Sequence, residues 1–159
     1  MAAVRHSRPP SKPKSDFSSA DADAFRRLRW ERLAQIASQD FKVKLDFGPG
    51  HGTDGSQVSI QKEADALAER GETLHESAHL FASSARGSRR AVDLSADRSP
   101  AEALAVHLIW HALEDARAEN IFLERYPGAD AFLEVRAEND SRRDAKLGAL
   151  HLLVRLAWG

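Results

Sequence analysis

The stretch His75-Glu76-Ser77-Ala78-His79 decides the fold expected for this chain of 159 residues. On a helix, histidines four residues apart lie on one face, and the carboxylate of Glu76 lies beside them. Two such imidazoles supply two of the three protein ligands that a catalytic zinc ion usually has, and a neighbouring carboxylate can take a proton from water. The stretch therefore predicts a zinc site on a helix, for which another element must supply the third ligand.

The residues around this stretch predict a helix with one buried side. Apolar residues recur at helical spacing over residues 62–82, among them Leu74, Ala78 and Phe81. Gly71 lies in the middle of this segment and weakens a helix by up to about 1 kcal/mol relative to alanine. We expect one helix over 62–82, with the two histidines in its last two turns.

A second helix is predicted over residues 99–125. Ser99-Pro100-Ala101-Glu102 combines an N-cap residue, a proline at the first helical position and a carboxylate at the third. Tyr126-Pro127-Gly128 then ends the helix. This helix is the expected source of the third ligand.

Polar residues in the middle of the second helix are candidate ligands. His107, His111 and Glu114 are spaced to share one face, and Asp115 lies next to that face. A buried imidazole or carboxylate costs several kcal/mol unless it is hydrogen-bonded, paired with a charge or bound to a metal. The stripe therefore favours a metal site. In the alternative interpretation, the histidines are satisfied core residues and the acidic side chains are solvated or salt-bridged.

The segments before the motif predict a first helix and a small β-structure, so the expected fold class is α+β and mostly α-helical. Strict alternation over residues 41–47, a turn signal at 48–55 and renewed alternation at Val58 and Ile60 predict a β-hairpin over 41–61. A first amphipathic helix is predicted over 22–38, with Phe25, Leu28, Leu33 and Ile36 on its apolar face.

The remaining segments are assigned from composition and periodicity. Residues 1–20 are rich in proline, serine and basic residues and are expected to form a disordered tail, whereas residues 21–159 form one domain. The other assignments are a loop at 83–98, a short helix at 130–137 and a longer helix at 142–158.

Composition excludes several classes of partner and ligand. The 23 Lys and Arg residues nearly balance the 24 Asp and Glu residues, and the basic segments lack interleaved aromatic residues, which argues against a nucleic-acid partner. The absence of cysteine leaves His, Asp and Glu as zinc ligands and is compatible with the cytoplasm, the expected location. Residues 1–20 contain no apolar h-region, and the most apolar stretch, 147–158, is interrupted by His151 and Arg155, so we expect neither a signal peptide nor a membrane span.

With these elements in order, the chain resembles zincin metallopeptidases of the glutamate-ligand kind, in which H-E-x-x-H on one helix is completed by a glutamate on a later helix. The likeness covers about residues 41–128 and also includes Leu113-Glu114-Asp115-Ala116-Arg117-Ala118-Glu119 and Arg125-Tyr126-Pro127-Gly128. This order is similar to the region ahead of the von Willebrand A domain in some bacterial and phage proteins related to nitric oxide reductase activation and cobaltochelatase-type proteins. Because no A domain follows here, the chain is expected to be a fragment or a stand-alone short form.

The resemblance implies a zincin-like fold, a zinc cofactor and a set of site residues. By position, it implies His75, His79 and Glu114 as zinc ligands and Glu76 as the catalytic base. It also implies Asp115, Arg117 and Glu119 as supporting residues. A cationic or phenolic group must steady the oxyanion in such a reaction, and the candidates are Arg117, His111 and Tyr126.

Two functions remain open from the sequence. In the first, the chain is a zinc-dependent metallopeptidase-like domain that hydrolyses a peptide or protein substrate, and the strand at 41–47 pairs with an extended peptide. In the second, implied by the resemblance alone, the metal only stabilises a non-catalytic interaction domain that acts with a AAA-type ATPase in the activation or metallation of a client enzyme.

Overall fold

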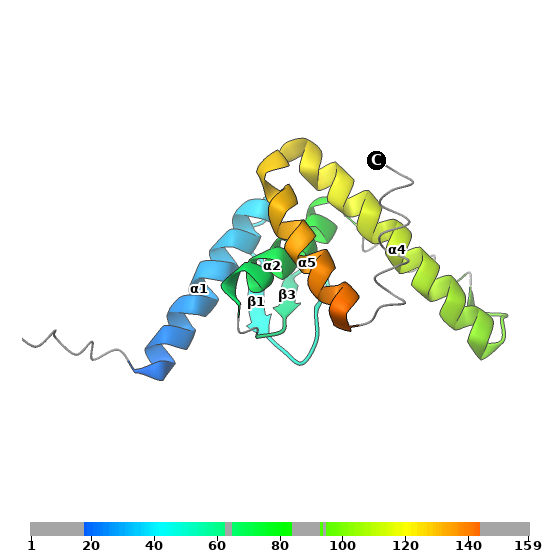
Figure 1. The fold of residues 1–159 in the computed structure, drawn as a ribbon, viewed down its shortest axis with the longest axis horizontal. Coiled ribbons are helices and arrows are strands. Elements are labelled where there is room, and N and C mark those ends of the chain that lie inside the picture. Colours follow the sequence, from blue (N-terminus) through cyan, green and yellow to red (C-terminus); the bar gives the residue numbers. More distant parts are fainter. Residues whose placement is uncertain (1–17, 63–64, 84–92, 94, 144–159) are drawn as a thin grey trace, which may run out of the picture.

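The structure is a computed structural model that describes residues 18–62, 65–83, 93 and 95–143. These residues form mainly α-helices and a small three-stranded sheet, which confirms the α+β, mostly helical class (Figure 1). Most of the predicted tail and of the predicted last helix lies outside the described residues. The elements are α1 (Ser19–Ser38), β1 (Lys44–Phe47), β2 (Gly52–Thr53), β3 (Gln57–Ile60), α2 (Ala66–Phe81), α4 (Pro100–Arg125), the 3-10 turn η1 (Pro127–Ala129) and α5 (Asp130–Arg143).

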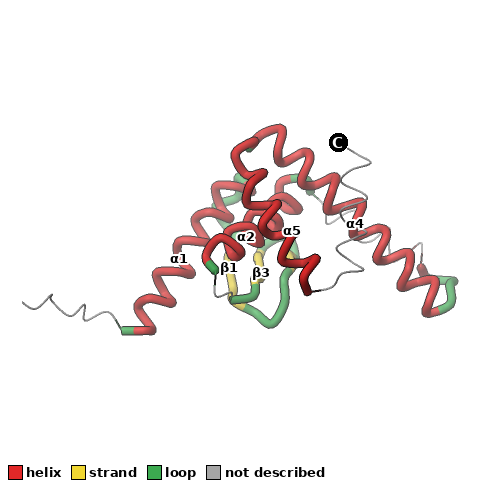
Figure 2. Tube along the Cα trace, in the orientation of Figure 1, coloured by secondary structure: helices red, strands yellow, loops and turns green. Residues whose placement is uncertain are grey.

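Helix α2, which carries the H-E-x-x-H stretch, lies at the centre of the fold. It packs against α1, α4, α5 and β3, and α1 and α4 run along opposite sides of it (Figures 1 and 2). The helix begins later than predicted because Asp65 caps it: the Asp65 side chain accepts a hydrogen bond from the backbone N–H of Leu67. Its middle is therefore enclosed by other elements, and both His75 and Glu76 are buried.

The predicted capping of the second helix is confirmed in α4. The Ser99 hydroxyl accepts a hydrogen bond from the backbone N–H of Glu102, and the Glu102 carboxylate accepts one from the backbone N–H of Ser99. The C-terminal half of α4 packs against α2, whereas its first turns project beyond the other helices (Figure 1). No helix in the described part of the chain is both long enough and apolar enough to cross a lipid bilayer.

The strand pairing differs from the predicted hairpin. The sheet order is β1-β3-β2, and β1 pairs with β3 in parallel, with Leu45 opposite Val58. The antiparallel pair is β2 with β3, with Gly52 opposite Ser59. Alternation predicted correctly that segments 41–47 and 57–61 contain strands, but it carries no information about strand direction.

The turn between β2 and β3 explains this pairing. The Asp54 carboxylate accepts hydrogen bonds from the backbone N–H groups of Ser56 and Gln57, and Gly55 adopts a left-handed φ of 95°. This tight turn reverses the chain after β2, so the chain must first cross from β1 to the far side of β3. The turn residues thus make a hairpin of β2 and β3 and leave β1 parallel to β3.

The free edge of β1 is covered by side chains of α1. Arg27 Nε and Gln35 Nε2 donate hydrogen bonds to the carbonyl oxygens of Leu45 and Val43, both at 2.9 Å. The backbone N–H of Leu45 donates to Glu31 Oε2 at 3.3 Å. The other edge of the sheet is β2.

The buried face of α1 matches the predicted one only at Leu33, which is partly buried and packs against both core clusters. Phe25, Leu28 and Ile36 are 67%, 50% and 59% exposed, whereas Trp30 and Ala34 are buried. Trp30 faces inward because its ring packs on the sheet residues and its Nε1–H donates to the buried Glu69 at 2.8 Å. Hydrophobicity alone does not identify the buried side of α1. Trp30 is buried because its apolar ring packs on the sheet and its N–H has a buried acceptor.

Two clusters of apolar side chains make up the core of the described residues. One lies between α1 and the sheet and consists of Trp30, Ala34, Val43, Leu45, Val58 and Ile60. The other lies among the helices and consists of Ala37, Leu74, Ala78, Ala118, Phe122, Ala129 and Leu133. Together they hold α2 between the sheet and the pair formed by α4 and α5.

Gly71 allows α2 and α5 to approach each other closely. A Cβ atom built on Gly71 meets the carbonyl oxygen of Phe132 at 2.5 Å and the Cβ of Arg136 at 2.9 Å. Neither distance is compatible with ordinary van der Waals contact, so the glycine that weakens the helix locally is required by the packing.

We expect Gly71→Ala to lower the free energy of unfolding by about 1–2 kcal/mol, because overpacking costs about 1–3 kcal/mol and the helix propensity of alanine offsets up to about 1 kcal/mol. Urea denaturation measures this change. Gly50→Ala is the matched control, since a Cβ there meets nothing within 4 Å. A Gly71→Ala protein as stable as the wild type would contradict the close approach.

Candidate metal centre

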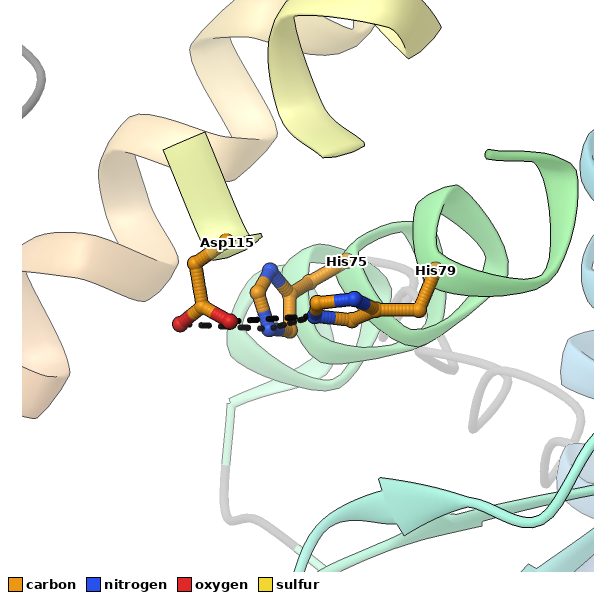
Figure 3. A group of neighbouring side chains, drawn as sticks. All are labelled: His75, His79 and Asp115. Atoms are coloured by element: carbon orange, nitrogen blue, oxygen red, sulfur yellow. Dashed lines mark hydrogen bonds and ion pairs between the residues drawn. The ribbon is translucent and has the colours of Figure 1, made fainter. Parts of the chain in front are cut away.

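Two helices bring three metal-ligating side chains together. His75 and His79 of α2 and Asp115 of α4 each present a ligand atom, and these atoms lie within 4.8 Å of one another. His79 Nε2 is 3.1 Å from Asp115 Oδ1 and 3.2 Å from His75 Nε2. Figure 3 shows both rings and the carboxylate pointing toward one another. This group could hold a metal ion.

The donor set and spacing fit a zinc-like ion. With Zn–N bonds of about 2.0–2.1 Å and a tetrahedral angle, two coordinating nitrogens lie about 3.3 Å apart. The 3.2 Å between the two Nε2 atoms is close to that value. Two imidazoles and one carboxylate also match the three-ligand sets of catalytic zinc sites, which keep a fourth position open.

Glu119 of α4 orients one of the imidazoles. His75 Nδ1 lies 2.9 Å from Glu119 Oε1, and because an ionised carboxylate only accepts, Nδ1–H is the donor. The lone pair of neutral His75 then lies on Nε2, which faces His79 and Asp115. A carboxylate behind a ligating histidine fixes its tautomer and raises its basicity. Glu119 was predicted as a supporting residue, and the structure places its carboxylate against His75 Nδ1.

Arg136 of α5, which sequence reasoning missed, lies behind the same carboxylates. Its Nη1 is 3.6 Å from Glu119 Oε1 and its Nη2 is 3.9 Å from Asp115 Oδ2. Its Nε is 3.0 Å from Asp140 Oδ2. Burial lowers the pKa of Arg136, but Asp140, Asp115 and other surrounding carboxylates outweigh burial and raise it. Arg136 is therefore a fixed positive charge beneath the candidate centre.

The charges around His75 and Asp115 stabilise both in their ionised forms. Burial and Arg136 lower the pKa of His75, but Asp115 and Glu119 outweigh them and raise it to about 9. Burial raises the pKa of Asp115, but His75, His79 and Arg136 outweigh burial and hold it well below its usual value. Without a metal, His75 therefore carries a proton at neutral pH, and a metal ion must displace that proton.

Two other carboxylates of α2 are less readily ionised. Burial raises the pKa of Glu76, the predicted base, above its ordinary value, although His75 and His79 oppose this shift. Burial likewise raises the pKa of Glu72 to about 7, against the opposing effect of Arg136. Glu76 thus lies beside the candidate ligands in surroundings that favour a proton on its carboxylate.

The structure does not bring Glu114, the third ligand implied by the resemblance, into this group. Arg117 Nε donates to Glu114 Oε2 at 2.8 Å, and Arg117 Nη2 donates to Glu114 Oε1. The same guanidinium donates to the carbonyl oxygen of Ala82 at the end of α2. Glu114 and Asp115 differ by about 100° around the helix axis. Asp115, not Glu114, is the residue of α4 that faces the histidines.

A pocket of about 550 Å³ opens onto the candidate centre. His75, Glu76, His79 and Asp115 form part of its wall, and residues of β2 and of the first half of α4 complete it. Of the three predicted oxyanion candidates, His111 lines this pocket, whereas Arg117 and Tyr126 do not. The other lining residues are His51, Gly52, Thr53, Gly55, Leu80, Ser83, Trp110 and Arg136.

Tyr126 is the C-cap residue of α4 and does not line the pocket. Its hydroxyl donates to the carbonyl oxygen of Ile36 at 3.4 Å and accepts from Gln39 Nε2 at 3.2 Å. The Tyr126 ring packs against Phe81 and Phe122. The residue joins the end of α1 to the helical core.

Comparison with known proteins finds no relative of this chain: no family model, no curated protein and no solved structure matches it.

We expect the zinc affinity of the protein to rise with pH between about 6.5 and 9. In this range His75 of the metal-free protein is protonated, because its pKa is raised to about 9, and the metal must displace that proton. One displaced proton changes the apparent affinity about tenfold per pH unit. Zinc titration in a competing chelator at several pH values measures the slope. A pH-independent affinity would contradict direct coordination by His75.

Asp115→Asn is expected to lower zinc affinity by more than the roughly 10–100-fold cost of losing a supporting residue. Glu114→Gln should leave the affinity nearly unchanged, since Glu114 is held by Arg117. Equilibrium dialysis of both variants compares them directly. If Glu114→Gln loses zinc and Asp115→Asn retains it, Glu114 is the third ligand, as the resemblance implies, and Asp115 is not.

Proposed function

We propose that this chain forms a zincin-like, zinc-dependent metallopeptidase domain that hydrolyses peptide bonds. One observation carries the proposal: a buried glutamate adjoins two histidines and an aspartate at the wall of a 550 Å³ pocket. His75, His79 and Asp115 would hold the zinc ion, Glu119 would orient His75, and Arg136 would balance the surrounding carboxylates.

The proposed reaction divides between the metal and Glu76. Zinc, when bound, supplies Lewis acidity toward the scissile carbonyl and lowers the pKa of water. Glu76 accepts the proton of the attacking water and delivers it to the leaving amine. Its surroundings suit both transfers, because burial raises the pKa of the carboxyl while the neighbouring imidazoles favour its ionised form.

His111 is the proposed group that steadies the oxyanion. It lines the pocket, one turn of α4 before Asp115. Arg136 also lines the pocket, but its guanidinium faces Asp115, Glu119 and Asp140. An imidazole at the pocket wall can donate a hydrogen bond to developing negative charge without giving up a buried ion pair.

The edge strand β2 is the proposed docking element for an extended substrate. Its two residues, Gly52 and Thr53, line the pocket. An extended peptide can add to a sheet edge through backbone hydrogen bonds. The strand at 41–47, first expected in this role, is a poor candidate because side chains of α1 cover the edge of β1.

Glu76→Gln tests the reaction. We expect it to lower the hydrolysis rate by about 10²–10⁴-fold while the protein retains zinc, because only the proton-transfer group is lost. Cleavage of a mixture of unstructured peptides by the zinc-loaded protein is followed by mass spectrometry. The control is Glu124→Gln, which changes an exposed carboxylate of α4 outside the pocket.

The outcomes separate the two functions left open by the sequence. Zinc binding without hydrolysis in the wild type, or equal hydrolysis by wild type and Glu76→Gln, would overturn the peptidase proposal. The first of these results would favour the non-catalytic domain, in which the metal fixes α2 against α4 and the partner is a AAA-type ATPase.

A further inference from the structure

A second pair of histidines on α4 has the geometry of the first pair. His107 Nε2 and His111 Nε2 are 3.0 Å apart, and their rings meet edge-on with centroids 4.3 Å apart. The corresponding values for His75 and His79 are 3.2 Å and 4.7 Å. Both members of the α4 pair are exposed, on the half of the helix that projects from the fold (Figure 1).

We propose that His107 and His111 form a second, solvent-exposed binding site for a divalent transition-metal ion such as Zn²⁺ or Cu²⁺. The contact between the rings requires one Nε2–H to donate to the other Nε2, so both Nε2 atoms already face one point. For both Nε2 atoms to bind a metal ion, the donating ring moves its proton through solvent to its own Nδ1, so both imidazoles stay neutral, and water completes the coordination. Imidazole suits both ions, and the order of divalent affinities favours Cu²⁺.

The position of this site connects it with the buried centre. His107, His111 and Asp115 follow one another at intervals of four residues, so they lie on one face of α4 about 6 Å apart along the axis. His111 lines the pocket that also reaches His75 and His79. An ion bound by the exposed pair therefore lies at the mouth of the pocket.

This arrangement gives the exposed pair the role of a transient capture site, and His111 takes its oxyanion role only after the ion has passed to the buried centre. His75 is 2% exposed and lines the pocket, which offers an ion a path to it. Two ligands bind more weakly than the three of the buried group, which allows the ion to leave the outer site for the inner one. This role rests on the buried centre being a metal site, whereas binding by His107 and His111 does not depend on it.

Binding is tested by titrating Zn²⁺ into the wild type and variants in a calorimeter. His79→Ala removes a ligand of the buried centre, and His107→Ala removes one of the exposed pair. His6→Ala is the matched histidine control. We expect the wild type and the control to show two classes of zinc site, a tighter one at the buried centre and a weaker one at the exposed pair. His79→Ala should show only the weaker class, and His107→Ala should show only the tighter class.

Spectroscopy identifies the ligands. Cu²⁺ bound to His79→Ala should show electron paramagnetic resonance couplings from two imidazole nitrogens, and these should be lost when His107→Ala is added. Binding by His79→Ala that is unchanged by His107→Ala overturns the second site. If His107→Ala abolishes the weaker class of site while His79→Ala binds zinc as the wild type does, the exposed site is upheld and the buried centre is refuted.

Stopped-flow zinc uptake tests the capture role. His107→Ala should slow loading of the buried centre several-fold at low free zinc, without changing its equilibrium affinity, because only the entry step is affected. Equal uptake rates for wild type and His107→Ala would overturn this role.

Discussion

The fold depends on matching the buried charges of α2. Three turns of this helix carry Glu69, Glu72 and His75, all of which are buried, and an uncompensated buried charge costs several kcal/mol. Each one faces a different helix. Glu69 pairs with Arg26 of α1, Glu72 lies 3.7 Å from Arg136 of α5, and His75 contacts Glu119 of α4. Each contact joins α2 to one neighbouring helix, and loss of either partner would leave an uncompensated buried charge.

The same matching prepares the candidate metal centre. Without a metal, Arg136 and protonated His75 face the carboxylates of Asp115 and Glu119, and Arg136 also contacts Asp140. When a divalent ion displaces the proton of His75, the cluster gains one positive charge. Ionisation of the adjacent Glu76 carboxyl can compensate for this charge. Metal binding and the ionisation of the proposed base are thus linked through one cluster of charges.

Local signals in the sequence predicted the elements, whereas long-range geometry decided the site. The cap at Ser99 and the helical spacing of the motif depend on residues within one turn, and both predictions hold. The choice between Glu114 and Asp115 depends on the rotation of α4, which its packing on α2 sets. Arg136 gave no local signal of burial, since a lysine or arginine four residues from Asp140 is also typical of an exposed helix face. Gly71, which the sequence indicated only as a weak point of the helix, lies where α5 comes close to α2.

The covered edge of β1 has a consequence for the behaviour of the protein in solution. Exposed strand edges are templates on which other chains add strands and aggregate. Arg27, Glu31 and Gln35 occupy the longer edge with side-chain hydrogen bonds, and the opposite edge is only the two residues of β2. The described sheet therefore offers very little backbone for edge-to-edge self-association, although Phe41 and several apolar residues of α1 remain exposed nearby. Charged and amide side chains of one helix act here as a substitute for a neighbouring strand.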